Sequence, residues 1–570
     1  MPVRQKINSA HCISAIILLL AGCTASPKPF FQDIAEESGL NFVHFNGMSG
    51  KFYIAEIMGS GCALFDMDND GDLDVYLVQS GVPDPEKGTM KPGPEMLQDR
   101  LFRNDLKVNE DGSRTISFTD VTQASGIEAL EYGMGVAVGD YNNDGLPDLY
   151  ITAYGANHLY KNEGDGVFSD VTLAAGVSED RWSVSAAFAD IDGDGLLDLF
   201  VGNYLDYTFE TNQQCFNAGP NYCNPLSYPP LPDRLFRNKG DGTFEDISQS
   251  SGLTAYPANS LGVVASDLNN DGMVDLYVAC DGEANLLWYN EGGGVFKESA
   301  LLSGCAFNGM GQAEASMGID AGDFDGDGDD DLFMTHLAGE TNTIYVNNGK
   351  GFFEDRTIQT GLANPSQAFT GFGTAWFDYD NDSLLDLLIV NGAVTTIPEL
   401  VAKKDPYPLH QPNLLFRNMG HSKFVEISGE AGSVFQLSEV GRGSAFGDLD
   451  NDGDTDVLIA NNNGPVRLLE NLVGTTNHWL GLKLMDGNVQ VVGARVGLFR
   501  EEKTTLWRRS RREASYGSAC DPRVLFGLGV DTGIDAVQVI WPDGAKESWN
   551  NLKADNWHTL VKGQGTRIEP

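Results

Sequence analysis

The stretch LFDMDNDGDLDVYLV, residues 64 to 78, places an Asp at every second position from Asp66 to Asp74, between two apolar runs. Carboxylates this close repel one another and β-strands disfavour Asp, so the stretch calls for a cation. Oxygen ligands at loop positions 1, 3 and 5, a turn glycine (Gly71) at position 6 and a carbonyl at position 7 match the first half of a calcium loop. An EF-hand ends with Glu at position 12, whereas this loop has Asp at position 9 and continues as the strand-like VYLV. We therefore expect a calcium loop in a β-hairpin; the alternative is a solvated acidic turn.

The same pattern occurs seven times, which argues against a chance acidic turn. Successive copies begin 74, 50, 77, 56, 55 and 70 residues apart. This spacing is too long for one hairpin and suits a four-stranded unit with variable connections. The predicted ligands are Asp66, Asp68, Asp70, Asp72 and Asp74; Asp140, Asn142, Asp144 and Asp148; Asp190, Asp192, Asp194 and Asp198; Asp267, Asn269, Asp271 and Asp275; Asp323, Asp325, Asp327, Asp329 and Asp331; Asp378, Asp380, Asp382 and Asp386; and Asp448, Asp450, Asp452, Asp454 and Asp456.

Each copy has the same neighbours. A small residue, Gly in six copies and Ser185 in the third, stands five residues before the first Asp, as a close backbone approach would require. An apolar strand follows the loop, then a third strand such as RLFRN (100 to 104). Six copies also have a fourth strand such as SFTDV (117 to 121), and a seventh, FFQDI (30 to 34), stands alone near the start. We expect an all-β, seven-bladed β-propeller closed by this N-terminal strand, with no open edge.

These motifs resemble a known family. The FDxDxDGxxD repeats are similar to the FG-GAP or VCBS repeats of integrin-α-type seven-bladed propellers. NHWLGLKL (477 to 484), VGARVGLF (492 to 499), DPRVLFGLG (521 to 529) and VQVIWPDG (537 to 544) resemble the ASPIC/UnbV domain. Together they resemble the cartilage-acidic-protein-like family, which implies a propeller over residues 30 to 472 and a small β-rich domain over 473 to 570.

The loops differ in their expected affinity for calcium. The fifth has six carboxylates and should bind tightest, while Asn142 and Asn269 should weaken the second and fourth. Ser383 replaces the turn glycine of the sixth loop, which makes that loop the expected vacancy among up to seven Ca²⁺ sites.

The charge balance narrows the partners. The formal net charge is −44, and 30 of the 81 acidic residues lie in the seven loops by direct count. A chain this acidic has no basic groove for nucleic acid. The one dense basic run, WRRSRRE (507 to 513), is interpreted as a solvated or partner-facing strand.

The N-terminus resembles a bacterial lipoprotein precursor. Arg4 and Lys6 precede an apolar run over 13 to 20, and LAGC ends at Cys23. We expect a signal peptide over 1 to 22, lipidation at Cys23, a tether over 23 to 29, and export to the cell envelope, the outer membrane in a Gram-negative cell. Membrane contact would then come through the anchor alone. An ordinary signal peptide is the alternative.

Cysteine placement agrees with an oxidising compartment. Cys215 and Cys223 share an insertion rich in Pro, Tyr and Asn, so a disulfide between them is plausible. Cys62 and Cys280 fall in expected strands and are interpreted as buried thiols.

Function is expected on the face opposite the calcium loops. The long insertions over 79 to 99, 203 to 233 and 391 to 412, and the segment 41 to 58, all connect strands on that face. Arg442 is the only charge at its position in the seven repeats. Either it forms a structural salt bridge with Glu56 or Glu314, or Arg442, His44, Glu56 and Trp182 form a channel-mouth site.

Two function classes remain open from the sequence. The first is a non-catalytic adhesion or ligand-binding propeller that takes a protein or glycan. The second is a carbohydrate-active lyase or dehydratase with a transition metal or an Arg/His site. His44, His158, His336 and His410, which map to the ligand face, are the expected discriminator. The absence of a nucleophile elbow, HExxH or phosphate loop favours binding.

Overall fold

The computed structural model describes residues 28–84, 89–91, 98–129, 131–216 and 219–569. The predicted signal peptide and Cys23 lie outside these residues. Within the described part of the chain, no helix is both long enough and apolar enough to span a bilayer.

Each repeat forms one antiparallel sheet, and the acidic loop joins the first two strands of that sheet, as predicted. Successive apolar residues of these strands face opposite sides of the sheet and pack against the neighbouring sheet on each side. This packing gives an all-β, propeller-like core. The strands are β2 (Cys62–Phe65), β3 (Asp74–Leu77), β6 (Arg100–Asn104) and β9 (Phe118–Asp120); β10 (Tyr132–Gly139), β11 (Asp148–Tyr154), β12 (His158–Gly164) and β13 (Val167–Asp170); β14 (Ser183–Ala189), β15 (Asp198–Asn203), β18 (Arg234–Asn238) and β19 (Phe244–Asp246); β20 (Ser260–Ser266), β21 (Asp275–Cys280), β22 (Leu286–Asn290) and β23 (Phe296–Glu298); β24 (Ile319–Gly322), β25 (Asp331–Met334), β26 (Thr343–Asn347) and β27 (Phe353–Asp355); β28 (Gly371–Phe377), β29 (Asp386–Asn391), β30 (Leu414–Asn418) and β31 (Phe424–Glu426); and β32 (Gly441–Gly447), β33 (Asp456–Asn461) and β34 (Arg467–Asn471).

The last repeat takes its fourth strand from the N-terminal end of the described chain. Strand β1 (Phe31–Asp33) pairs antiparallel with β34, and Phe31 lies opposite Asn471. The buried Phe31 ring packs near Phe377 and Phe435 of the adjoining structure.

Short helices follow several fourth strands. A glycine with positive φ ends five of these helices, for example Gly126 at +79° and Gly361 at +93°, where a Cβ would be strained. The helices are α1 (Thr122–Ser125), α2 (Thr172–Ala175), α3 (Ala300–Ser303), α4 (Thr357–Thr360), α5 (Ala363–Ser366), α6 (Pro398–Ala402) and α7 (Ser428–Ala431), and the 3-10 turns are η1 (Ile54–Ile57), η2 (Pro225–Ser227), η3 (Leu253–Ala255), η4 (Ser433–Gln436) and η5 (Gly474–Thr476).

The C-terminal region forms two sheets around its own core, in which Leu482, Phe526 and Trp541 are buried. The first sheet holds β35 (His478–Asp486), β36 (Val489–Gln490), β41 (Val524–Gly529) and β44 (Trp557–Val561). The second holds β37 (Arg495–Phe499), β38 (Leu506–Arg509), β42 (Ala536–Ile540), β43 (Lys546–Trp549) and β45 (Thr566–Arg567).

A hairpin from this C-terminal region enters the space between the inner strands of the repeats. Strands β39 (Glu513–Ala514) and β40 (Ser518–Ala519) contact β2, β10, β14, β20, β24 and β32, and β40 pairs parallel with β2. A Cβ at Gly61 would overlap the carbonyl oxygen of Gly517, which explains the small residue predicted at this position. From the other end η1 closes the same space, and the Tyr516 hydroxyl donates to the Met58 carbonyl at 2.9 Å where the two meet.

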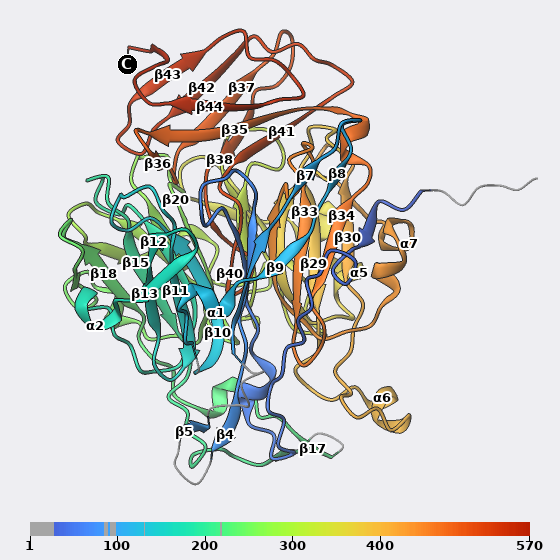
Figure 1. Cartoon of the computed structure of the whole chain (residues 1–570). Helices are drawn as coiled ribbons and strands as arrows, with labels where there is room; N and C mark the ends of the chain where they lie inside the picture. The colour runs from blue at the N-terminus through green and yellow to red at the C-terminus, as the bar shows by residue number, and fades with distance from the viewer. Residues whose placement is uncertain (1–27, 85–88, 92–97, 130, 217–218, 570) are drawn as a thin grey trace, which may run out of the picture.

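Two ends of the molecule are therefore distinct (Figure 1). The C-terminal sheets lie at one end, above the acidic loops, and the insertions gather at the other. The insertions contain β4 (Val82–Asp84) and β5 (Thr89–Lys91), β16 (Cys215–Phe216) and β17 (Pro220–Asn221), and α6. The remaining short strands, β7 (Lys107–Val108) and β8 (Arg114–Thr115), extend the connection after β6.

Candidate metal loops and the opposite face

The acidic loops share one backbone fold. The first Asp accepts hydrogen bonds from backbone N–H groups of its own loop; Asp140, for example, accepts from Asp144 at 3.1 Å and Gly145 at 2.8 Å. Position 4 has positive φ, as at Asn143 (+55°), and position 6 has positive φ as well, as at Gly145 (+92°). These turns fold the chain back on itself, so the side chains at positions 1 and 3 converge with position 5 in the first and third loops and with position 9 in the fifth, sixth and seventh.

Five loops bring three carboxylates together. In each, one oxygen per residue lies within 4.8 Å of the others, a spacing that a shared cation would require. The groups are Asp66, Asp68 and Asp70; Asp190, Asp192 and Asp194; Asp323, Asp325 and Asp331; Asp378, Asp380 and Asp386; and Asp448, Asp450 and Asp456. In the second and fourth loops Asn142 and Asn269 supply neutral amide oxygens, which accept from the N–H of Asp144 and Asp271.

Several of these carboxylate oxygens are buried and have no hydrogen-bond partner among the described residues. They are one oxygen each of Asp66, Asp68, Asp323, Asp331 and Asp380. A buried oxygen without a donor is costly, and a hard cation with oxygen ligands would satisfy it. The residues therefore fit a bound Ca²⁺.

The electrostatics point the same way. Burial, the largest cause, raises the pKa of Asp74 to about 8, against two backbone hydrogen bonds that lower it, and the charges of Asp68 and Asp66 add to the increase. Burial and the charges of Asp452 and Asp448 likewise raise the pKa of Asp450 to about 8. These carboxylates need a compensating positive charge.

The Asp at position 9, predicted as a ligand, also has a structural role. Asp74 accepts from the backbone of Met67 at 2.8 Å and of Asn104 at 2.8 Å, so it joins the loop to the third strand. Six of the seven position-9 residues use both oxygens in this way. The exception is Asp331, which accepts from Asn347 and keeps its second oxygen free.

One set of structural residues was not assigned from the sequence. The Asn that ends each third strand donates to the backbone at position 2 of the loop in the preceding repeat; Asn162, for example, donates to Met67 at 2.8 Å. Asn104 of the first repeat donates to Leu449 of the last at 3.1 Å. The signal was the Asn at the end of every third-strand motif. The other five donors are Asn238, Asn290, Asn347, Asn418 and Asn471.

The sixth loop keeps the shared geometry despite Ser383. Ser383 takes φ +84°, the same value as Gly195 in the third loop, and the carboxylates of Asp378, Asp380 and Asp386 still converge. The Ser383 hydroxyl donates to the Gly527 carbonyl at 2.9 Å. The carboxylates of this loop therefore have the geometry of the other loops, and its predicted vacancy stays a prediction.

The channel-mouth site predicted from His44, Glu56, Trp182 and Arg442 is not a ligand site. All four side chains are buried, with relative exposures of 2% or less. His44 contacts the Ser80 hydroxyl and accepts from the Asn463 backbone, and Glu56 accepts from Ser49 and the Tyr222 hydroxyl. Burial, with the charge of Arg442, lowers the pKa of His44 to about 3, so this ring is neutral.

The predicted salt bridge of Arg442 was also wrong. No carboxylate pairs with Arg442 among the described residues; instead its guanidinium donates to the carbonyls of Ile57 at 2.6 Å and Gly392 at 2.9 Å, and also to Gly441 and Ala393. It stacks 3.9 Å from the centre of the Phe372 ring. Arg442 thus links the inner strands to η1.

The basic run 507 to 513 is neither solvated nor free for a partner. Arg511 pairs with the buried Asp320 at 2.5 Å, and Arg509 pairs with Asp330. The run therefore binds the acidic end of this chain's own repeats, opposite to the sequence-based interpretation.

The histidines do not gather into a metal site. His158 pairs with Asp170, and His336 contacts the Ser316 hydroxyl. Across the described ranges, none of the clusters able to hold a metal contains a histidine.

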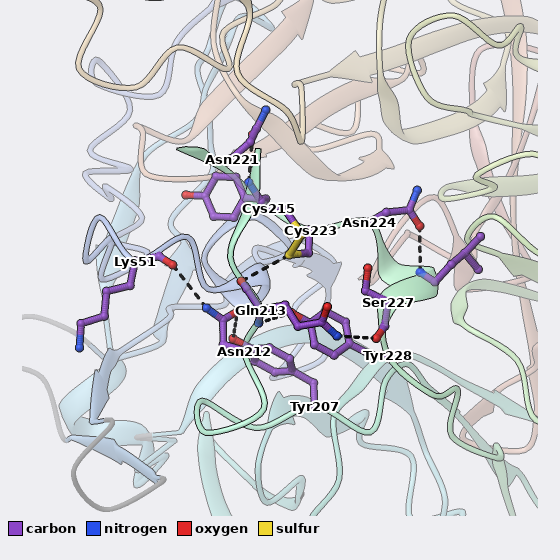
Figure 2. Close-up of a disulfide and its surroundings, with 12 residues drawn as sticks. Lys51, Tyr207, Asn212, Gln213, Cys215, Asn221, Cys223, Asn224, Ser227 and Tyr228 are labelled. Atoms are coloured by element: carbon purple, nitrogen blue, oxygen red, sulfur yellow. Dashed lines mark hydrogen bonds between the residues drawn. A yellow bond between two sulfur atoms is a disulfide. The ribbon is translucent and has the colours of Figure 1, made fainter. Parts of the chain in front are cut away.

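The opposite face carries a cavity, and the disulfide shown in Figure 2 lies beside it. Cys215 in β16 and Cys223, two residues after β17, are bonded, and both border a cavity of about 500 Å³. Asn221, Asp281, Glu340 and Phe372 also line this cavity. Its size is in the range of small-ligand sites.

Acidic hairpin loops repeated through propeller-like sheets, with a β-rich domain over the loops, define a class of acidic-loop repeat proteins. FG-GAP-like repeat models match residues 66–151, 140–201, 226–278, 267–334 and 323–389, and the ASPIC and UnbV model matches 485–567. The chain belongs to the cartilage-acidic-protein-like family of FG-GAP-repeat proteins with an ASPIC and UnbV domain.

Curated relatives agree with this assignment. Cartilage acidic protein 1 of Xenopus tropicalis is 26% identical over 320 residues, 55% of this chain and 38% of that protein. The Mus musculus and Homo sapiens proteins are 24% and 25% identical, over 59% and 61% of this chain and 52% and 50% of theirs. The chain thus spans about half or less of the length of these relatives.

Solved structures are more distant. An Agrocybe aegerita lectin that recognises non-reducing terminal N-acetylglucosamine has a TM-score of 0.37 at 15% identity, over 71% of this chain and 87% of that one. YCF48 bound to a D1 peptide has a TM-score of 0.37 at 8% identity, over 72% and 90%.

Proposed function

We propose that this protein is a calcium-stabilised, non-catalytic binding propeller, with seven blades in a closed ring and its ligand on the face opposite the calcium loops. One observation carries the proposal: the acidic loops and the C-terminal domain occupy one end of the repeats, while the long insertions build a cavity at the other. Loops that a rigid scaffold presents on one face are a common place for binding.

Closure of the ring is supported by the inter-repeat contacts. The inner strands are neighbours in the cycle β2, β10, β14, β20, β24, β28, β32 and back to β2. The seven Asn side chains that end the third strands repeat one hydrogen bond around this cycle, including the one from Asn104 to Leu449.

Calcium is supported by the converging carboxylates and by their unpartnered oxygens. Positions 1, 3, 5 and 9 of each loop, with the carbonyl at position 7, would hold the ion, and bound Ca²⁺ would neutralise the mutual repulsion of these carboxylates. With millimolar Ca²⁺ and dissociation constants of about 10⁻⁴ to 10⁻³ M, each site adds about 0.4 to 1.4 kcal/mol to the free energy of unfolding. A melting temperature that is the same in calcium and in excess chelator would exclude this role.

The ligand face is tested by binding to a combined glycan and protein array. Leu226 lines the cavity on the insertion face and is 54% exposed. Leu173, on α2, is 87% exposed and is not among the described residues that line the cavity, so it serves as the control position. Leu226→Arg should remove array binding and Leu173→Arg should keep it. Binding that is lost only in Leu173→Arg would contradict the proposed face.

Export and lipid anchoring at Cys23 belong to the same proposal. They are supported by the LAGC motif and by a disulfide that suits an oxidising compartment. Metabolic labelling with an alkyne fatty acid should mark the protein, and Cys23→Ala should remove the label. Unchanged labelling in Cys23→Ala would exclude the anchor.

A further inference from the structure

The cavity beside the disulfide has two acidic side chains and no basic one in its described lining. Asp281 and Glu340 line it, and neither forms an ion pair with a described residue. Arg, Lys and His are absent from its described lining. A ligand that enters this cavity therefore meets two carboxylates and no cation.

The two carboxylates are held on either side of one residue. Asp281 pairs across a β-bridge with Ala315, and the Ala315 N–H donates to Glu340 at 2.9 Å. The Tyr204 hydroxyl fixes one oxygen of Asp281 at 2.6 Å, and the Leu337 N–H also donates to the same oxygen of Glu340. Each carboxylate thus has one oxygen held by the protein and one with no hydrogen bond among the described residues.

A third polar group in the cavity is independent of these acids. Asn221 is 2% exposed, and its oxygen accepts from the backbone of Tyr222 at 3.0 Å and Thr396 at 3.3 Å. Its amide nitrogen has no partner among the described residues. A buried donor left unpaired costs free energy, and a ligand oxygen would satisfy it. Figure 2 shows Asn221 on the strand that leads to Cys223, next to the disulfide.

The residues that line the walls and rim of the cavity indicate the shape and polarity of its ligand. Met58, Met317 and Phe372 line the interior, so a long apolar stem fits better than a flat polar ring. Phe216 and Leu226 at the rim are 72% and 54% exposed, as is typical of a surface that contacts another protein.

We propose that this cavity receives a Lys or Arg side chain from a partner protein. The cationic group pairs with Asp281 and Glu340, a backbone carbonyl of the partner accepts from Asn221, and its apolar residues cover Phe216 and Leu226. Charge-assisted hydrogen bonds are strong when both groups leave water, and a chain with a net charge of −44 attracts basic partners over longer range. The inference rests on the proposed ligand face.

The raised pKa of Asp281 agrees with this assignment. Burial raises it to about 7, even though the Tyr204 hydroxyl lowers it, while the charges of Glu340 and Glu283 raise it further. An incoming ammonium or guanidinium group would favour the ionised form of this carboxyl.

The test is a calorimetric titration of the calcium-loaded full chain with a blocked pentapeptide, Gly-Gly-Lys-Gly-Gly, and with the same peptide acetylated at the Lys Nζ. We expect acetylation to weaken binding at least tenfold. Asp281→Asn and Glu340→Gln should each weaken binding of the free-lysine peptide by a similar factor. Glu354→Gln removes the same charge from an exposed site on the same repeat and should change nothing.

A second variant guards against misfolding. Thr395 is exposed at the cavity, so Thr395→Lys should occupy the acidic groups from within and block the peptide without loss of thermal stability. Equal binding of the acetylated peptide, wild-type affinity in folded Asp281→Asn and Glu340→Gln, or displacement of the peptide by glucose would each overturn the proposal. If array binding still depends on Leu226 in that case, the ligand face stands and only the basic side chain is wrong; if it does not, the proposed function fails as well.

Discussion

The sixth and seventh acidic loops lie beneath the C-terminal domain, whereas the third faces solvent, although all three share one motif. The Gly529 N–H donates to Asn381 at 2.8 Å, and the Trp557 indole donates to Asp448 at 3.1 Å. Asp378 and Asp448 are 7% and 2% exposed. No hydrogen bond from the described C-terminal residues reaches the third loop, where Asp192 and Asp194 are exposed. The same nine-residue motif thus forms an interface in the sixth and seventh repeats and an exposed loop in the third.

Ion pairs between the C-terminal region and the repeats should contribute more to the free energy of unfolding than ion pairs on the exposed surface. Arg511→Ala leaves the buried Asp320 without its partner, which costs about 3 to 5 kcal/mol of unfolding free energy. Arg356→Ala breaks an exposed pair with Glu354 and should cost less than about 1 kcal/mol. Urea denaturation of both variants measures the difference. Equal losses would show that the covered pair is as weakly coupled as a surface pair.

The loss of unfolding free energy in Arg511→Ala should also depend on pH. Burial, the largest cause, raises the pKa of Asp320 to about 6, although the charge of Arg511 lowers it. Without Arg511 the pKa of the folded state rises further, so the folded variant binds a proton that the unfolded chain, with a pKa near 3.8, has lost. Protonation relieves the unpaired charge, and the deficit should therefore be smaller at pH 5 than at pH 8. A deficit that grows as the pH falls would contradict this account.

Much of the repeat fold could be predicted from the sequence because each blade strand and loop is a local pattern. The acidic hairpins follow from the Asp and Gly spacing, and the N-terminal strand follows from the one unmatched FFQDI motif. What a local pattern does not contain is the docking of one region on another. Arg509 and Arg511 were predicted to be solvated because their carboxylate partners, Asp330 and Asp320, lie more than a hundred residues away in the sequence. A salt bridge was predicted for Arg442 because a buried cation needs an acceptor. Its actual acceptors are backbone carbonyls, which every residue has, so no sequence pattern could identify them.

The hydrogen bonds between neighbouring loops should contribute more to stability where the C-terminal domain buries them. Asn381 is fully buried, and its amide donates to Gly453 at 2.9 Å and Gly474 at 3.1 Å. Asn143 holds the same position in the second loop and donates only to Gly195, at 3.0 Å. Glycine keeps the positive φ, so each Asn→Gly change tests mainly the side-chain bonds.

We expect Asn381→Gly to cost about 2 to 3 kcal/mol, because buried carbonyls lose their donor, and Asn143→Gly about 0.5 to 1 kcal/mol. Calcium is held saturating, and the midpoints of thermal unfolding are compared. A larger loss in Asn143→Gly would mean that the link at the second loop, where Asn488 of the C-terminal region also donates to Asp144, contributes more to stability than the buried link at the sixth loop.

The smallest effect concerns the turn residue at position 6. Gly195 and Ser383 both have φ +84°, but nothing lies within 4 Å of a Cβ at Gly195, whereas the Ser383 hydroxyl bonds to the Gly527 carbonyl. In the open loop, Gly195→Ser adds left-handed strain without a compensating contact and should cost about 1 to 2 kcal/mol. In the covered loop, Ser383→Gly relieves that strain and loses the bond to Gly527 and two long bonds from the Arg500 guanidinium, both at 3.4 Å, so gain and loss nearly cancel, within about 0.5 kcal/mol. Thermal unfolding of the two variants in saturating calcium measures both. A large loss in Ser383→Gly with no loss in Gly195→Ser would show that the hydroxyl matters more than the backbone, and that the C-terminal domain stabilises the sixth loop chiefly through this one bond.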